Sequence, residues 1–187
     1  MSAKHESAIG HVTGRAVYTD EQHEPRGLAS LYPVQAPHAH AKLLALDAAA
    51  ARAMPGVLAV LTAADIPGEN DTGPIRHDEP MIAADTIAYW GQPVAWVVAT
   101  DEARAKSAAA QVEARYEPLP ACLSIDEAIA RGQYFGPPAV VARGDAPRAL
   151  AQSTHRVQGE VRTGGQDHFY LETQASWVHV DSEGLVH

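Results

Sequence analysis

Apolar and polar residues first form a regular pattern in the segment "LLALDAAAARAMPGVLAVLT", residues 43–62. Residues 43–46 are apolar and predict a strand, and Asp47 can accept hydrogen bonds from the free N–H groups of an Ala-rich helix. Pro55 and Gly56 stop this helix, and the β-branched run at residues 57–62 predicts a second strand. The predicted order is strand, helix, strand.

A second segment, "PVAWVVATDEARAKSAAAQVEARYEP" at residues 93–118, repeats this plan. Residues 94–99 predict an apolar strand, and Thr100 is the expected N-cap of the helix that follows, which is expected to end near Gln111. Asp101 and Glu102 place negative charge at the positive end of the helix dipole. Residues 112–116 alternate apolar and polar positions, which predicts another strand.

The two segments together predict the fold class, which is α/β (α+β). Two β-α-β units are joined by a loop at residues 66–80 that is rich in Gly, Pro and Asp. This arrangement favours one mixed α/β layer domain. The pattern leaves open whether the sheet is parallel or mixed.

The character of the chain changes after residue 120. Ser124 with Glu127 three residues later forms a capping-box signature for a short helix that ends at Gly132. The following stretch, "GQYFGPPAVVARGD", is rich in glycine and proline, so we expect a linker and a domain boundary at residues 133–144. Asp145 is a possible cap for a brief helix at residues 146–151.

The last part of the chain has a strand-like pattern. Residues 156–161 alternate, Gly164 and Gly165 interrupt the alternation, residues 169–180 resume it, and residues 181–184 form a strong turn signal. Three residues after a hairpin turn are too few to complete a sheet. The pattern therefore predicts that the chain is a fragment, cut near the start of a second domain.

Composition and charge exclude several classes of function. Apolar residues make up 46% and charged residues 20% of 187 residues, which indicates a packed, soluble domain. The formal charge is −9 without a basic run, so nucleic acid is not an expected partner. The longest apolar stretches are far shorter than the roughly 20 residues of a membrane span, so no span is expected. No secretory signal is visible at the N-terminus. The chain has one cysteine, so an internal disulfide is impossible, which fits a cytoplasmic location.

Two histidine-containing stretches are candidates for chemistry. His38 and His40 would share one face of a strand, as two metal ligands do, but no further His or Cys lies near them at ligand spacing. The stretch "HDEP" at residues 77–80 has the residue types of acid–base chemistry, yet it lies in a predicted loop. An ordinary structural or solvated role is favoured for both stretches. No G-x-S-x-G or P-loop motif supports a nucleophilic triad or a phosphate site.

The stretch "RTGGQDHFYLETQ" at residues 162–174 is the third candidate. Paired glycines allow a ligand to approach the backbone closely, and Gln166 offers two donors and one acceptor without charge. On a strand, His168, Tyr170 and Glu172 would share one face, and Phe169, Leu171 and Thr173 the other. Taken alone, this pattern favours a turn that leads into a strand.

The same stretch, read as "GGQDHFYLETQ", closely resembles the "GGQEHFYLE" motif of the molybdenum hydroxylases, the xanthine dehydrogenase and aldehyde oxidase family. Five further segments resemble the family's N-terminal α/β hammerhead domain, in the right order: residues 14–21, "PHAHAKLLALD", "MPGVLAVLTAADIPGENDTGPI", "GQPVAWVVA" and "ARYEPLPA". Within the family, "PGENDTGPIRHDEPMIA" is most similar to the molybdopterin-binding large subunit of bacterial xanthine dehydrogenases.

The resemblance implies a domain order. Residues 1–13 would be an N-terminal tail, residues 14–132 the hammerhead domain, residues 133–144 a linker, and residues 145–187 the first strands of a truncated molybdopterin-binding domain. It also implies oxidative hydroxylation of a purine, hypoxanthine or xanthine to urate, with water as the oxygen source. The molybdenum–molybdopterin cofactor would carry the chemistry, and FAD and 2Fe-2S clusters on partner subunits would take up the electrons.

By resemblance, Gln166 lies beside the molybdenum oxo ligand and Gly165 belongs to the cofactor-binding turn, while no residue of the chain ligates the metal directly. Asp167 stands where the family usually has glutamate. The family's catalytic glutamate would lie beyond His187, so the chain alone is expected to be inactive. Two alternatives stay open: an aldehyde oxidase-type or other molybdenum hydroxylase, and a non-catalytic domain that docks against other subunits.

Overall fold

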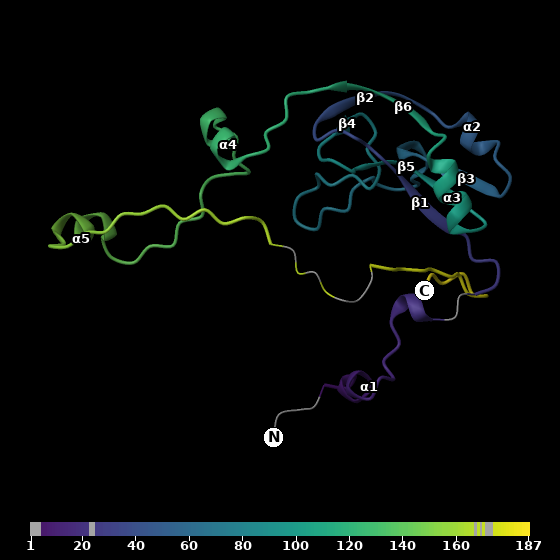
Figure 1. Ribbon diagram of the computed structural model, residues 1–187, viewed down its shortest axis with the longest axis horizontal. Helices are drawn as coiled ribbons and strands as arrows, with labels where there is room; N and C mark the ends of the chain where they lie inside the picture. Colours follow the sequence, from purple (N-terminus) through teal and green to yellow (C-terminus); the bar gives the residue numbers. More distant parts are fainter. Residues whose placement is uncertain (1–4, 23–24, 167, 169, 171–173) are drawn as a thin grey trace. The chain divides into compact units, whose positions relative to one another are not determined.

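The strand β5, Pro93–Ala99, lies at the centre of a three-stranded antiparallel sheet between β1, Ser30–Gln35, and β3, Val57–Leu61 (Figure 1). Its valines and alanines suit a strand with a neighbour on each side. Val97 pairs with Tyr32 on one neighbour and with Val60 on the other. One row of side chains therefore crosses the whole sheet.

A second antiparallel sheet has β2, Ala41–Asp47, at its centre, between β4, Thr86–Ile87, and β6, Glu113–Pro118. Residue pairs such as Lys42 with Glu117 and Leu43 with Tyr116 fix its register. The charged pair has its nitrogen and oxygen 3.5 Å apart at an exposed position, where such a pair stabilises the fold only weakly.

The computed structural model describes residues 5–22, 25–166, 168, 170 and 174–187. The chain forms two compact units, one of Pro25–Pro137 and one of Met1–Glu24 together with Pro138–His187. All six strands of the two sheets lie in the first unit. Among the described residues, no helix has the length and apolar character needed to cross a bilayer.

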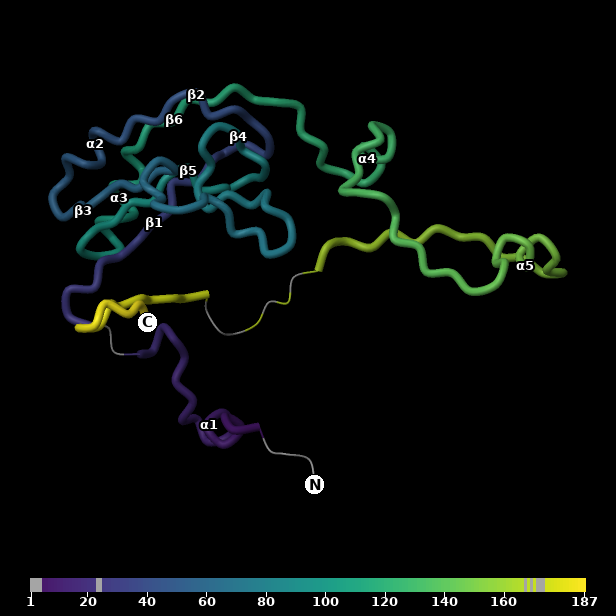
Figure 2. Tube along the Cα trace, turned by 180° about the vertical axis from the view of Figure 1, so that it is seen from behind, coloured from purple at the N-terminus to yellow at the C-terminus, as the bar shows by residue number. Residues whose placement is uncertain are grey.

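The two strand–helix–strand segments have the predicted order, but their strands lie in different sheets. The chain runs from β2 through α2, Ala49–Arg52, to β3, and from β5 through α3, Glu102–Ala109, to β6 (Figure 2). Each segment therefore crosses from one sheet to the other. The question of a parallel or mixed sheet is also answered, because all pairs in both sheets are antiparallel.

Hydrogen bonds at the helix starts explain where α2 and α3 begin. Asp47 accepts from the Ala49 N–H at 2.8 Å, as the sequence predicts. The prediction of Thr100 as the N-cap of α3 is wrong, because Asp101 is the cap and accepts from the Arg104 N–H at 2.9 Å. The backbone N–H of Thr100 donates to the Gly56 carbonyl at 2.9 Å, which extends the pairing of β5 with β3 by one hydrogen bond.

Small side chains dominate the hydrophobic core. Helix α3 packs on β1 and β5, and α2 packs on β3 and α3. Alanines on both helices and on the strands allow the backbones to approach closely, and valines and Ile87 fill the remaining space. The buried cluster, which draws on both sheets, consists of Val34, Ala36, Ala41, Ala48, Ala51, Val60, Ala83, Ile87, Val94, Ala95, Val97, Ala108 and Ala109.

Short helices precede and follow the six strands along the sequence. Helix α4, Ile125–Arg131, begins at Ser124, whose hydroxyl accepts from the Glu127 N–H at 3.2 Å, and ends at Gly132 with φ of 64°. Helix α5, Ala146–Gln152, is capped by Asp145. These features confirm the predictions for both helices. The other short helices are α1, Ala8–Val12, and the 3₁₀ turns η1, Thr19–Glu21, and η2, Ala63–Asp65.

The predictions for the C-terminal region have mixed outcomes. The turn at residues 181–184 is present, since Val180 bridges Val186 and Gly184 has φ of 84°. The strand predicted at residues 156–161 is not present, because these residues are exposed and pair with no strand of the described chain. Part of the predicted strand at 169–180 lies outside the described residues, and Val180 alone of the described part forms a bridge.

Candidate functional site

The motif around Gln166 lies after α5 in an extended, exposed part of the chain. Gly164 and Gly165 do not have positive φ, and a Cβ added to either would meet no atom within 4 Å. The side chain of Gln166 forms no hydrogen bond with any other described residue, so its amide is available to a ligand. The predicted turn at the paired glycines is therefore an open segment of chain.

The rest of the motif is described only in part. His168 is exposed, and the Tyr170 hydroxyl accepts a hydrogen bond from the Gln174 amide. Asp167 and the residues Phe169, Leu171, Glu172 and Thr173 lie outside the described residues. The predicted separation of this stretch into two strand faces stays a prediction.

The two histidines at residues 38 and 40 lie in a bend between β1 and β2, not on a strand. The imidazole Nδ1 of His40 is 2.8 Å from the Pro120 carbonyl oxygen, to which it can donate. His38 stands edge-to-face against the Tyr116 ring, with ring centroids 5.0 Å apart. Both histidines therefore contact residues in β6 or just after it. Such contacts are the structural role that the sequence favours.

A groove of about 450 Å³ lies along β1, α3 and β6. The lining residues that carry polar groups are Tyr32, Gln35, Lys106 and Tyr116. The Lys106 ammonium lies 5.9 Å from the centroid of the Tyr32 ring, within the range of a cation–π contact. Burial raises the pKa of the Tyr116 hydroxyl. The sequence did not predict this groove, because it joins residues distant in the chain.

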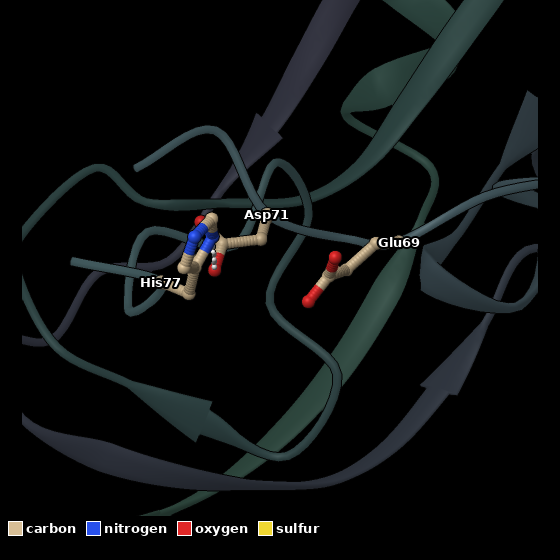
Figure 3. A group of neighbouring side chains, drawn as sticks. All are labelled: Glu69, Asp71 and His77. Atoms are coloured by element: carbon tan, nitrogen blue, oxygen red, sulfur yellow. Dashed lines mark ion pairs between the residues drawn. The ribbon is translucent and has the colours of Figure 1, made fainter. Parts of the chain in front are cut away.

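The loop at residues 66–80 brings together a histidine and two carboxylates. His77 Nδ1 lies 3.5 Å from Asp71 Oδ2, and Glu69 lies beside this pair (Figure 3). The sequence singled out His77 within "HDEP" but missed Asp71 and Glu69. The signal that could have found them is the alternation of acids in "GENDTG", in which Asp71 precedes the histidine by six residues.

Comparison with known protein families gives matches for two segments of the chain. The profile "Aldehyde oxidase and xanthine dehydrogenase, a/b hammerhead domain" matches residues 13–120, more than half of the chain. The chain belongs to this family. The profile "Molybdopterin cofactor-binding domain" matches residues 133–187 of the same chain. The chain thus carries an α/β hammerhead domain followed by a region that matches a molybdopterin cofactor-binding domain.

Named relatives in this family are oxidoreductases. A xanthine dehydrogenase of Dictyostelium discoideum is 39% identical over 183 residues, which cover 97% of this chain and 13% of that protein. Xanthine dehydrogenase 1 of Arabidopsis thaliana is 40% identical over 190 residues, 100% of this chain and 14% of that protein. Aldehyde oxidase 3 of Rattus norvegicus is 37% identical and covers 97% of this chain and 13% of that protein. The chain therefore spans about one seventh of the length of these relatives.

Solved structures share the same fold. The aldehyde oxidoreductase from Desulfovibrio desulfuricans ATCC 27774 is similar with a TM-score of 0.60 and 33% identity, over 67% of this chain and 15% of that chain. Quinoline 2-oxidoreductase from Pseudomonas putida 86 is similar with a TM-score of 0.64 and 27% identity, over 83% of this chain and 22% of that chain. The α/β fold predicted from the sequence is confirmed.

The described residues of the Gln166 motif do not enclose a molybdenum cofactor. Gln166 and its neighbouring glycines are exposed, and the space next to the glycines is open. In the described part of the chain, no buried side-chain polar atom lacks a hydrogen-bond partner, so no orphaned group marks a ligand position. The motif supplies one free amide, which by itself does not make up a cofactor site.

Proposed function

We propose that this chain is the N-terminal part of the molybdenum-cofactor subunit of a xanthine dehydrogenase of the bacterial, multi-subunit type. The complete protein would hydroxylate purines, hypoxanthine and xanthine to urate, with water as the oxygen source. The observation that carries this proposal is the similarity to xanthine dehydrogenases at 39–40% identity along nearly the whole chain. A cytoplasmic location and electron transfer to FAD and 2Fe-2S clusters on partner subunits belong to the same proposal.

The proposed domain order is a tail at residues 1–13, the hammerhead at residues 14–132, a linker at residues 133–144 and the start of the cofactor-binding domain at residues 145–187. Two observations support this division. Both sheets and the whole buried cluster lie within Pro25–Pro137. The cofactor-binding profile begins at residue 133, where the sequence becomes rich in glycine and proline.

Gln166 is proposed to contact the cofactor in the complete protein, with Gly165 leaving room for the approach. The neutral amide of Gln166 is exposed and bonded to no described residue, so it can donate to an oxygen without adding charge. At Gly165 the space that a Cβ would occupy is open. Because these residues alone do not enclose a ligand, we expect the purified chain of 187 residues to retain no molybdenum and to be inactive.

The function is tested on the complete protein, isolated with its partner subunits and assayed in H₂¹⁸O. Label in urate formed from xanthine would support the proposal. Turnover of aldehydes without turnover of xanthine would instead support the aldehyde oxidase-type alternative, which the similarity to aldehyde oxidase 3 favours as the second candidate. Absence of hydroxylation in a complex that contains molybdenum would overturn both and leave the subunit-docking role.

The role of Gln166 gives a separate prediction. Gln166→Ala in the complete protein should lower hydroxylation by about 10- to 100-fold, because groups that hydrogen-bond the ligands of a metal tune its reactivity by such factors. Steady-state kinetics together with the molybdenum content per subunit measure the effect. Gln158→Ala, an exposed glutamine in the same region, is the matched control and should behave as the parent protein. Equal turnover in the Gln166 variant would remove this residue from the site.

A further inference from the structure

We propose that Glu69, Asp71 and His77 form a binding site for a divalent transition-metal cation of the Zn²⁺ class. Each residue offers one ligand atom, and these atoms all lie within 4.8 Å of one another. The three residues come from the loop at residues 66–80, in the unit that holds the sheets. This site is separate from the proposed molybdenum function and does not depend on it.

The distance between two of the ligand atoms already fits a bound metal. Ligand atoms at about 2.0–2.1 Å from a tetrahedral zinc ion lie about 3.4 Å from each other. His77 Nδ1 and Asp71 Oδ2 are 3.5 Å apart. Figure 3 shows the imidazole and the carboxylate facing each other, with the Glu69 carboxylate next to them. Glu69 is exposed, so rotation of its side chain can bring an oxygen into the third ligand position.

The charges at this position are incompletely compensated in the described chain. The Asp71 side chain is only 10% exposed. Its Oδ1 accepts from the Gly73 N–H at 2.6 Å, whereas Oδ2 has the His77 ring at 3.5 Å, beyond a good hydrogen-bond distance. Glu69 makes no hydrogen bond or ion pair with another described residue. Two carboxylates face one imidazole, and a cation between the three groups would neutralise carboxylate charge at a side chain that is largely buried.

The residues next to the ligands hold the loop in place. The Asn70 side chain donates to the Ile82 carbonyl at 2.7 Å and accepts from the Ile82 N–H at 3.1 Å. Thr72 donates to the Glu79 carbonyl through its N–H at 2.8 Å and its hydroxyl at 3.0 Å. Asp71 lies between these two anchored residues. Hydrogen bonds of its two neighbours therefore fix the position of Asp71.

Glycine at residue 73 is required for the return of the loop toward Asp71. A Cβ at this position would lie 1.8 Å from the Arg76 carbonyl oxygen. This distance is far shorter than any non-bonded contact, so only glycine fits here. The backbone therefore passes close to itself here, and His77, the next residue after Arg76, reaches the carboxylate.

The chemistry of the ligands selects the kind of cation. One imidazole nitrogen with two carboxylate oxygens suits Zn²⁺ and related transition metals better than Ca²⁺ or Mg²⁺, which prefer oxygen ligands alone. Three protein ligands leave a fourth tetrahedral position for water. The bound ion would link Glu69 and Asp71, near the start of the loop, to His77, near its end.

The test is a titration of the metal-free, purified chain with ZnCl₂, followed by isothermal calorimetry and by competition with a chromophoric chelator. We expect one site per chain with a dissociation constant in the micromolar range. Glu69→Gln and Asp71→Asn should each weaken binding by about tenfold or more, because each removes a charged ligand. MgCl₂ should not compete.

Two control variants make the result specific. Asp78→Asn removes an exposed charge from the same loop, and His187→Ala removes a histidine that pairs with a carboxylate elsewhere, with His187 Nε2 and Asp181 Oδ2 2.8 Å apart. Both should bind zinc as the parent does. Glu69→Gln changes an exposed side chain, and circular dichroism will show that it stays folded. Absence of micromolar binding, or binding that Glu69→Gln and Asp71→Asn leave unchanged, would overturn the proposal.

Discussion

Gln92 shows how one residue ties a loop to the core. Its side chain is buried, with 1% of the residue exposed, directly before β5. The side-chain Oε1 accepts from the Ala88 N–H at 2.7 Å, and the backbone carbonyl accepts from the Ala36 N–H at 3.0 Å. Gly91 precedes it with φ of 85°, a conformation that favours glycine. These contacts hold the turn before β5 against the end of β1.

Gln92→Ala should therefore destabilise the fold by about 1–3 kcal/mol, because the buried Gln92 side chain and its part-buried hydrogen bond with the Ala88 N–H are both lost. Urea unfolding followed by circular dichroism measures this change. Gln133→Ala, at an exposed glutamine, is the control and should leave the free energy of unfolding nearly unchanged. Equal stability of both variants would show that the Gln92 hydrogen bond contributes nothing.

At the residue scale, the sequence predicts hydrogen bonds between neighbouring residues better than contacts between residues that are distant along the chain. The sequence predicts that Asp47, Ser124 and Asp145 accept backbone hydrogen bonds at the starts of helices, and each of them accepts one. Partners far along the chain could not be read in this way. The contact of His40 with Pro120 spans 80 positions, and no local pattern encodes it.

At the scale of the elements, the start of α3 depends on Asp101. The backbone N–H of Arg104, and then its guanidinium, hold the pKa of the Asp101 carboxyl below its usual range. A carboxylate with a lowered pKa stabilises the folded state above the pKa of the unfolded chain, and this contribution is lost as the pH falls through the folded pKa. The cap should therefore weaken in acid.

Asp101→Ala should lower the urea midpoint at neutral pH, and its difference from the parent should shrink as the pH is lowered through the acidic range. Asp101→Asn is the matched variant, since asparagine also caps helices but carries no titrating charge. It should keep most of the midpoint at neutral pH and lose the acid-dependent part. If Asp101→Ala and the parent unfold at the same midpoint at neutral pH, the cap does not contribute to stability.

The elements themselves were predictable where periodicity was strong. The strands β2, β3 and β5 and the helix α3 follow from apolar runs and an Ala-rich segment. The strands β1 and β4 were not predicted, because β1 contains Pro33 and β4 has two residues, and their partners β5 and β2 define them. Residues 156–161 alternate without a partner in the described chain, and alternation alone does not make a strand.

At the scale of the whole molecule, the unit Pro25–Pro137 contains every residue of the buried cluster. Residues 25–137 expressed alone should therefore unfold in one cooperative transition, with a urea midpoint close to that of the full chain. Circular dichroism and the dispersion of amide resonances measure this. A broad transition or collapsed resonances would mean that the remaining residues are needed for the fold.

The crossing of the chain between the two sheets has a further consequence. The strands before the loop at residues 66–80 are β1, β2 and β3, and those after it are β4, β5 and β6. Each strand pair of these sheets joins one strand from the first set to one from the second. A chain cut in this loop would give two pieces, and neither would hold a complete strand pair of these two sheets. Each piece would therefore form its strands only when it binds the other, as the two fragments of a split reporter protein do.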